Sequence, residues 1–192
     1  IENNTIGNAA YYNAGGDRVF GIRGMAGTIS IKNNIIRDLK SNGSSTGFSF
    51  FPGGIWLATT VAGANVEGNQ VYNIAHSNAG TSAYTIAGIY VASVSSTGTP
   101  TTISKNKIYN LTAAGTGTGT SSPRIWGIHV ASGSATYANN MIAVGSTVSN
   151  ESRIHGIEDL GTGTNNYYFN SVSLTGTTGS GSNSSYAFRR SG

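Results

Sequence analysis

The sequence of 192 residues contains no cysteine, three prolines and few charged side chains, which make up 9% of the chain. Without cysteine there is neither a disulfide framework nor a thiolate metal site, and no other spacing in the sequence predicts a metal or a cofactor. No stretch approaches the roughly 18 apolar residues of a transmembrane helix, so no membrane-spanning segment is predicted. The abundant Gly, Asn, Ser and Thr form helices poorly, and no segment keeps a helical apolar stripe. These absences favour an all-β fold.

Acidic residues are also scarce, with seven Asp and Glu against 11 Lys and Arg. The basic residues are scattered, and the longest run is Arg189-Arg190, so nucleic-acid binding is not predicted. Glycoside cleavage needs two carboxylates that face one another across a bond. The adjacent pair Glu158-Asp159 would point to opposite sides of a strand. The sequence therefore identifies no catalytic residue.

The sequence is rich in one recurring pattern, Asn-x-Ile or Asn-x-Val followed by a further aliphatic residue. The segment Asn106–Leu111 is nearly repeated at Asn69–Ile74 and at Asn34–Leu39. Upstream of each of these lies a Gly-Ile pair, such as Gly88-Ile89. The repeated unit is roughly 30–39 residues long, and its Asn positions are Asn4, Asn34, Asn69, Asn106, Asn140 and Asn170.

Each unit offers three short stretches of alternating apolar residues, separated by polar turns. This pattern predicts a right-handed parallel β-helix, or solenoid, of about six coils with three short strands each. Composition does not change along the chain, so residues 1–192 are expected to form a single domain. The sequence begins and ends within a repeat, which favours a segment of a longer repetitive protein, with further repeats of the same chain as partners at both ends.

The repeated Asn is predicted to be structural. An amide side chain carries both donors and acceptors, so it can bond the backbone of a turn and also the Asn of the next coil.

The position after each Gly-Ile pair is predicted to point outward, and it differs in every coil. If the Ile points inward, alternation places both the following residue and the preceding Gly on the surface. An aromatic and polar stripe beside a bare strip is typical of a surface that binds a sugar chain; alternatively, these side chains pack on one another across coils. The candidate ligand-binding residues are Arg23, Trp56, Tyr90, His129 and Glu158. Another outward column is interpreted as structural and comprises Arg37, Tyr72, Tyr109, Ala143 and Ser173.

Segments such as Gly88-Ile89-Tyr90-Val91 and Asn106-Lys107-Ile108 give the chain a resemblance to the right-handed parallel β-helix repeat family, the pectin-lyase-like solenoids. The Asn-x-Ile-Tyr-Asn-Leu motif and the Gly/Ser/Thr-rich loops resemble repeats of very large secreted proteins of Bacteroidota-type bacteria. Many of those proteins are exported by type 9 secretion. No position matches the acidic and basic clusters of the lyases, so no catalytic residue is carried over.

The resemblance implies a structural or adhesive segment of a secreted or cell-surface protein, with surface glycans or the outer-membrane secretion machinery as partners. The alternative is a polysaccharide lyase or glycoside hydrolase of the same fold, using His129 and Glu158.

Overall fold

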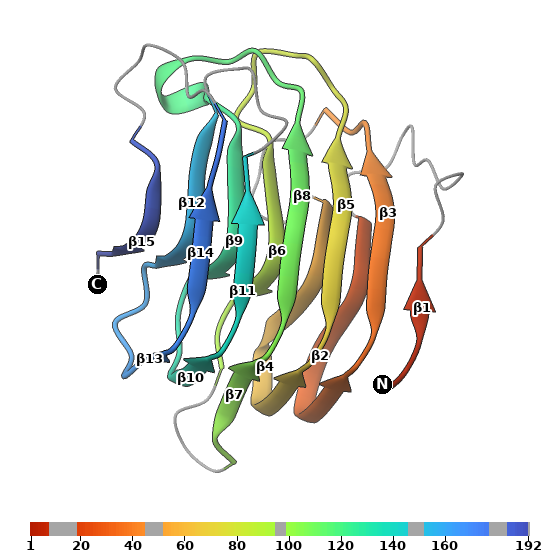
Figure 1. The fold of residues 1–192 in the computed structure, drawn as a ribbon, viewed down its shortest axis with the longest axis vertical. Coiled ribbons are helices and arrows are strands. Elements are labelled where there is room, and N and C mark those ends of the chain that lie inside the picture. The colour runs from red at the N-terminus through yellow and green to blue at the C-terminus, as the bar shows by residue number, and fades with distance from the viewer. Residues whose placement is uncertain (8–18, 45–51, 95–98, 146–151, 177–183, 192) are drawn as a thin grey trace.

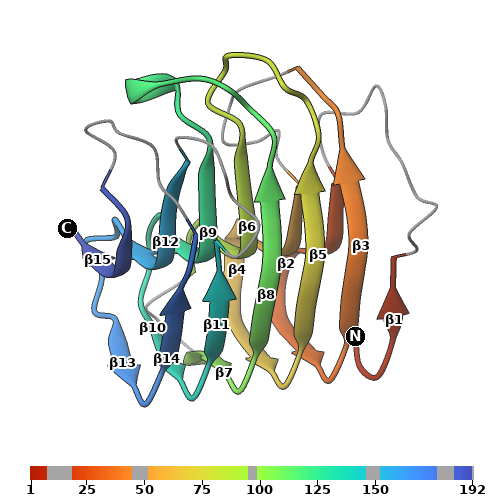
Figure 2. The same cartoon turned by 45° about the horizontal axis from the view of Figure 1, so that its top comes forward.

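The chain folds into an all-β parallel solenoid with three faces, and its coils wind right-handed (Figure 1, Figure 2). The structure, a computed structural model, describes residues 1–7, 19–44, 52–94, 99–145, 152–176 and 184–191. Within these residues the helical structure is one short 3₁₀ turn, η1 (Gly119–Ser121), and no helix is long and apolar enough to cross a membrane. The predicted fold class is confirmed.

Every strand pair is parallel, as expected when each coil lies on the previous one. The first face carries the Gly-Ile pairs and comprises the first halves of β2 (Val19–Lys32) and β4 (Pro52–Glu67), then β6 (Thr85–Val91), β9 (Arg124–Val130), β12 (Arg153–Asp159) and β15 (Tyr186–Arg190). The second face comprises the second halves of β2 and β4, then β7 (Thr101–Ser104), β10 (Ala135–Ala138) and β13 (Asn166–Tyr168). The third face comprises β1 (Thr5–Ile6), β3 (Ile35–Ser41), β5 (Gln70–His76), β8 (Lys107–Ala113), β11 (Met141–Val144) and β14 (Ser171–Leu174).

Two details differ from the expected coil. The third face holds a six-stranded sheet, but β1 and β15 belong to incomplete coils, so the described residues make fewer than the six complete turns expected. In addition, β2 and β4 run without interruption from the first face to the second. Their pairing shifts register after Gly24 and again after Gly27, which has a φ of 72°, and these irregularities bend the pair around the corner.

The Asn of each unit lies directly after the turn from the second face to the third, and its amide is bonded to those of the coils on both sides. Asn106 Nδ2 donates to Asn140 Oδ1 at 3.0 Å and to the Val66 carbonyl at 2.9 Å, while Asn106 Oδ1 accepts from Asn69 Nδ2 at 2.9 Å. The same side chain-to-side chain bond, 2.8–3.1 Å long, joins all six residues, and we call this row the Asn ladder: Asn4, Asn34, Asn69, Asn106, Asn140 and Asn170.

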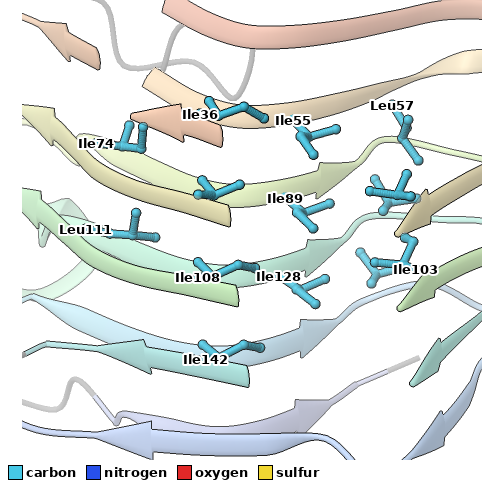
Figure 3. Close-up of a cluster of buried hydrophobic side chains, with 14 of the residues drawn as sticks. Ile36, Ile55, Leu57, Ile74, Ile89, Ile103, Ile108, Leu111, Ile128 and Ile142 are labelled. Atoms are coloured by element: carbon cyan, nitrogen blue, oxygen red, sulfur yellow. The ribbon is translucent and has the colours of Figure 1, made fainter. Parts of the chain in front are cut away.

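Aliphatic columns from the three faces fill the interior (Figure 3). Ile55, Ile89 and Ile128 stack from coil to coil on the first face, opposite Ile108 and Ile142 of the third. All five are at most 3% exposed. Because each coil adds one residue to each column, stacking is what removes this apolar surface from water.

The glycine of each Gly-Ile pair faces this interior, contrary to the expectation that it lies on the surface. A Cβ added to Gly88 would lie 2.4 Å from Cγ2 of Ile108, on the opposite face of the solenoid. Since Ile89 is also fully buried in the core, Gly88 and Ile89 both point inward, and simple alternation is interrupted there. Close approach of the third face excludes a side chain at this position, and so there is no bare outer strip. The glycines in the same situation are Gly21, Gly54, Gly88, Gly127 and Gly156.

Candidate functional site

The five candidate residues lie in one column on the outer side of the first face. Strand register pairs Arg23 with Trp56, Trp56 with Tyr90, Tyr90 with His129, and His129 with Glu158. The column continues one coil further, because Glu158 pairs with Arg189 of β15. We call this row the outer column.

Most of the outer column is buried, although an exposed stripe was expected. Only Arg23 is exposed, and its guanidinium lies 4.2 Å from the centroid of the Trp56 ring. The remaining four candidates are Trp56 at 8% exposure, Tyr90 at 8%, His129 at 1% and Glu158 at 3%. The packing alternative, in which these side chains contact one another across coils, describes this arrangement.

The side chains that pack against the outer column come from the position just before each Gly-Ile pair. His129 is stacked between two rings, with its centroid 3.9 Å from that of Trp126 and 5.2 Å from that of Tyr90. Phe20 lies against Trp56, with 4.7 Å between ring centroids. Trp56, Tyr90 and Trp126 thus form a second apolar cluster outside the solenoid interior. Large residues on both sides of an inward Gly-Ile pair allow such a cluster, since their side chains share the outer surface.

At its C-terminal end, the outer column becomes a charged cluster around Glu158. One carboxylate oxygen of Glu158, Oε2, lies 3.0 Å from Nδ1 of His129, and the other, Oε1, lies 3.0 Å from Nδ1 of His155. Arg189 completes the cluster by donating from a guanidinium nitrogen to Oε1 at 2.9 Å. His155 is held from its other side, where Nε2 lies 3.2 Å from the Ser184 carbonyl.

These contacts determine the charge of the cluster. Burial by itself would raise the pKa of Glu158, but hydrogen bonds with His129 and His155 outweigh it and hold this pKa well below the usual range of a carboxyl group. Burial lowers the pKa of His129 in spite of its contact with Glu158. At neutral pH the cluster therefore contains an ionised Glu158 paired with Arg189, beside a neutral His129.

The neighbouring carboxylate, Asp159, points to the other side of β12, into the solenoid. Asp159 is fully buried, and its carboxylate accepts hydrogen bonds from the Gly161 amide at 2.9 Å and from Asn165 Nδ2 at 3.1 Å. Arg190 Nε lies 3.6 Å from it. The two carboxylates are thus separated by the strand and do not face one another across a common cavity, which is the arrangement that glycoside cleavage needs.

A partly open pocket of about 160 Å³ adjoins the Glu158 cluster. Its lining residues are Arg124, Trp126, Arg153, His155, Glu158, Leu160 and Arg189. The sequence places Glu158 among the candidate residues, and it also indicates that His155 lies near the His129–Glu158 pair. Trp126 and Arg189 were not predicted. The signals for them were the position before each Gly-Ile pair and the last coil, both of which follow from the repeat spacing.

The described residues contain no group of three or more His, Asp or Glu side chains that could hold a metal ion. The imidazole nitrogens nearest Glu158 lie 3.0 Å from its oxygens, and so the cluster is arranged to satisfy a buried charge. Whether the outer column also binds a ligand stays a prediction.

Comparison of the chain with family models, with curated proteins and with solved structures gives no match.

Proposed function

We propose that this chain is a structural, adhesive solenoid segment of a large exported bacterial protein, located at the cell surface or secreted. It acts as a rigid shaft that holds other parts of the protein away from the surface and contacts glycans. The proposal includes export by type 9 secretion and a family relationship with pectin-lyase-like solenoids, and both rest on the sequence motifs of the repeats.

The Asn ladder is the observation that carries the proposal. It lies directly before the six strands of the third face and includes both side-chain and backbone bonds. The backbone amide of Asn69 donates to Asn106 Oδ1 at 3.0 Å, and that of Asn106 donates to Asn140 Oδ1 at 3.1 Å. A structure fixed by the same bonds at every coil resists bending and local opening. Such uniform reinforcement along an axis suits a shaft.

The two ends of the stack support the proposal of further coils as partners. Phe188 is aligned with Ile157 in a core column, yet it is 46% exposed. Each ladder bond runs in the same direction, so Asn4 donates to Asn34 and Asn170 accepts from Asn140. A coil placed before Asn4 would donate to its oxygen, and one placed after Asn170 would accept from its amide. The ends are therefore complementary to coils of the same kind.

Sedimentation velocity over a range of protein concentrations tests this proposal. We expect the chain to associate end to end and the association to weaken in Phe188→Asp, which places a charge in the exposed core column. The matched control is Met141→Asp, since Met141 is 58% exposed but lies on the outer side of the third face. Equal sedimentation of the wild type and Phe188→Asp at every concentration would contradict the proposal.

Arg23 is the residue of the outer column through which glycan contact can be tested directly. It is exposed, and its guanidinium lies over the ring of Trp56. We expect Arg23→Gln to weaken glycan binding in a glycan array while leaving the fold intact, because the substitution removes no buried group. Unchanged binding of every glycan would remove the outer column from the proposal.

The polysaccharide-cleaving alternative receives its support from the pocket that brings His155 and Glu158 together. Its prediction is product release from a polysaccharide panel that Glu158→Gln abolishes. The low pKa of Glu158 disfavours a role as general acid, since such a group must be protonated near the working pH.

A further inference from the structure

A shallow cavity of about 220 Å³ lies on the outer side of the third face, away from the outer column. Its floor is formed where the large side chains of one column give way to small ones: Tyr109 of β8 is followed by Ala143 of β11 and Ser173 of β14, in register. Met141 and Lys107 line one side. We call this place the Tyr109 shelf.

The ring of Tyr109 forms the end wall of the shelf. One face of the ring is covered by Tyr72, at 4.8 Å between centroids and 7° between planes. The opposite face looks along the column toward Ala143, whose side chain ends at Cβ. Two coils without a ring leave about 10 Å along the column, because neighbouring strands lie about 4.8 Å apart. That length accommodates one ring stacked on Tyr109.

Lys107, Ser171 and Ser173 supply polar side-chain groups to the lining of the shelf. The Lys107 ammonium lies over the Tyr109 ring, 5.3 Å from its centroid, and the hydroxyls of Ser171 and Ser173 belong to β14. The lining includes a cation and two hydroxyls, and no carboxylate. An occupant is therefore expected to combine an apolar face with several hydroxyl or other oxygen acceptors at its rim.

We propose that the Tyr109 shelf binds a single pyranose ring of a glycan chain. The C–H groups on one face of a pyranose fit the electron-rich face of Tyr109, and its equatorial oxygens reach Lys107 and the serine hydroxyls. A flat aromatic ring would stack equally well but would leave these polar edge groups without partners. Tyr72 and Tyr109 were interpreted from sequence as structural; Tyr72 keeps that role as the support behind the binding ring.

Methyl NMR tests this proposal, because the sequence contains two methionines. Met141 lines the shelf, whereas Met25 lies on β2 and is 50% exposed, so it serves as an internal control. The probes are cello-, xylo-, manno-, chito- and galacturonate oligosaccharides, added to the intact chain with ¹³C-labelled methionine methyl groups. We expect at least one of them to shift the Met141 signal in a saturable way and to leave the Met25 signal in place.

Three substitutions separate the ring from the fold. Tyr109→Ala should weaken the saccharide affinity about tenfold or more, while Tyr109→Phe should retain it within about threefold. Tyr168→Ala is the matched control, since Tyr168 is 51% exposed on β13, outside the shelf, and it should leave affinity unchanged. Ala143→Tyr should abolish binding without removing any group, because it extends the stack of rings over the floor.

The proposal is overturned if no saccharide shifts Met141, or if Tyr109→Ala binds like the wild type. If Tyr109→Ala does not fold, retention of binding by Ala143→Tyr overturns it equally. A Met141 shift that follows protein concentration without saccharide would assign the shelf to a second copy of the chain. The saccharide results do not affect the sedimentation test at Phe188, so failure of saccharide binding and failure of the shaft proposal are distinguishable.

Discussion

The Asn ladder and the outer column are both stacked side chains at one position per coil, but they are built in opposite ways. The ladder uses the same residue six times and each amide bonds to the next. The outer column uses a different residue in each coil: Arg23, Trp56, Tyr90, His129, Glu158 and then Arg189. Both are largely buried.

The comparison shows that a residue type can be repeated in every coil of a stack only if its side chain can bond to a copy of itself. An amide can satisfy its own copy indefinitely because it donates and accepts at once. A carboxylate cannot, since like charges at coil spacing repel. Glu158 is tolerated because its neighbours differ from it: nitrogen atoms of His129, His155 and Arg189 lie 2.9–3.0 Å from its oxygens. We therefore expect the repeated column to determine stability coil by coil and the varied column to determine local chemistry.

The largest effect is expected from breaking the ladder in its middle. Asn106→Ala leaves the buried backbone amide of Asn69 without its acceptor, and it removes one hydrogen bond each from the Val66 carbonyl and from the side chain of Asn69. Each such loss costs about 1–3 kcal/mol, so we expect a loss of about 3–5 kcal/mol in the free energy of unfolding, measured by urea denaturation. Asn4→Ala, at the exposed end, is the control; an equal loss there would contradict the coil-by-coil view.

In the outer column, Glu158→Gln should lower the free energy of unfolding by about 2–4 kcal/mol. The substitution removes the charge that Arg189 and the two histidines satisfy, and breaking a buried ion pair from one side is strongly destabilising. Thermal or urea unfolding measures the change. The control is Glu67→Gln, since Glu67 makes an exposed pair with Lys105 at 2.7 Å, and such pairs contribute little. A Glu158→Gln variant as stable as Glu67→Gln would mean that the cluster carries no structural role.

A third substitution tests a second repeated column, the glycines of the Gly-Ile pairs. Gly88→Ala should destabilise the chain by about 1–3 kcal/mol, because the added Cβ would lie 2.4 Å from Cγ2 of Ile108 and 2.7 Å from the Gly127 carbonyl oxygen. In Gly53→Ala the nearest atoms lie at 3.2 Å, and the change should be smaller. Equal unfolding midpoints of the two variants would contradict the inward placement of Gly88.

The smallest effect concerns pH at another varied position, where Ser41, His76 and Ala113 are aligned. Burial lowers the pKa of His76, offset only in part by the backbone at Gly43. Below about pH 6.5 the unfolded chain therefore binds a proton that the folded chain does not, and the free energy of unfolding falls as the pH is lowered. His76→Gln should reduce this slope in urea titrations between about pH 7 and pH 5. An unchanged slope would show that His76 does not titrate differently in the two states.

The solenoid could be predicted from sequence because its signal is repeated in every unit. Strand register followed from the same repeat: Ile36, Val71 and Ile108 are aligned on the third face as their common distance from the Asn requires. One regular feature was overlooked, namely that the residue before each Asn has a positive φ, as Asn33 does at 53° and Gly68 at 67°. The frequent Asn and Gly at this place were the available signal.

The exposure of the outer column could not be predicted by alternation. Simple period-two counting from Ile89 placed Gly88 outside, but the extra inward residue changes the count for everything before it. Trp126 thereby joins His129 on the outer side instead of the interior. This departure from alternation depends on the close approach of Gly88 to Ile108, which are 20 positions apart in sequence and on opposite faces.

The direction of the Asn ladder has an electrical consequence. Every amide donates toward the C-terminal coil and accepts from the N-terminal one, so the individual amide dipoles point the same way and add along the solenoid axis. Hydrogen bonds aligned in this manner polarise one another. The row places partial positive charge at Asn170 and partial negative charge at Asn4, which is the reverse of the polarity of an α-helix. An anionic group is therefore favoured near the Asn170 end of the axis and a cation near Asn4.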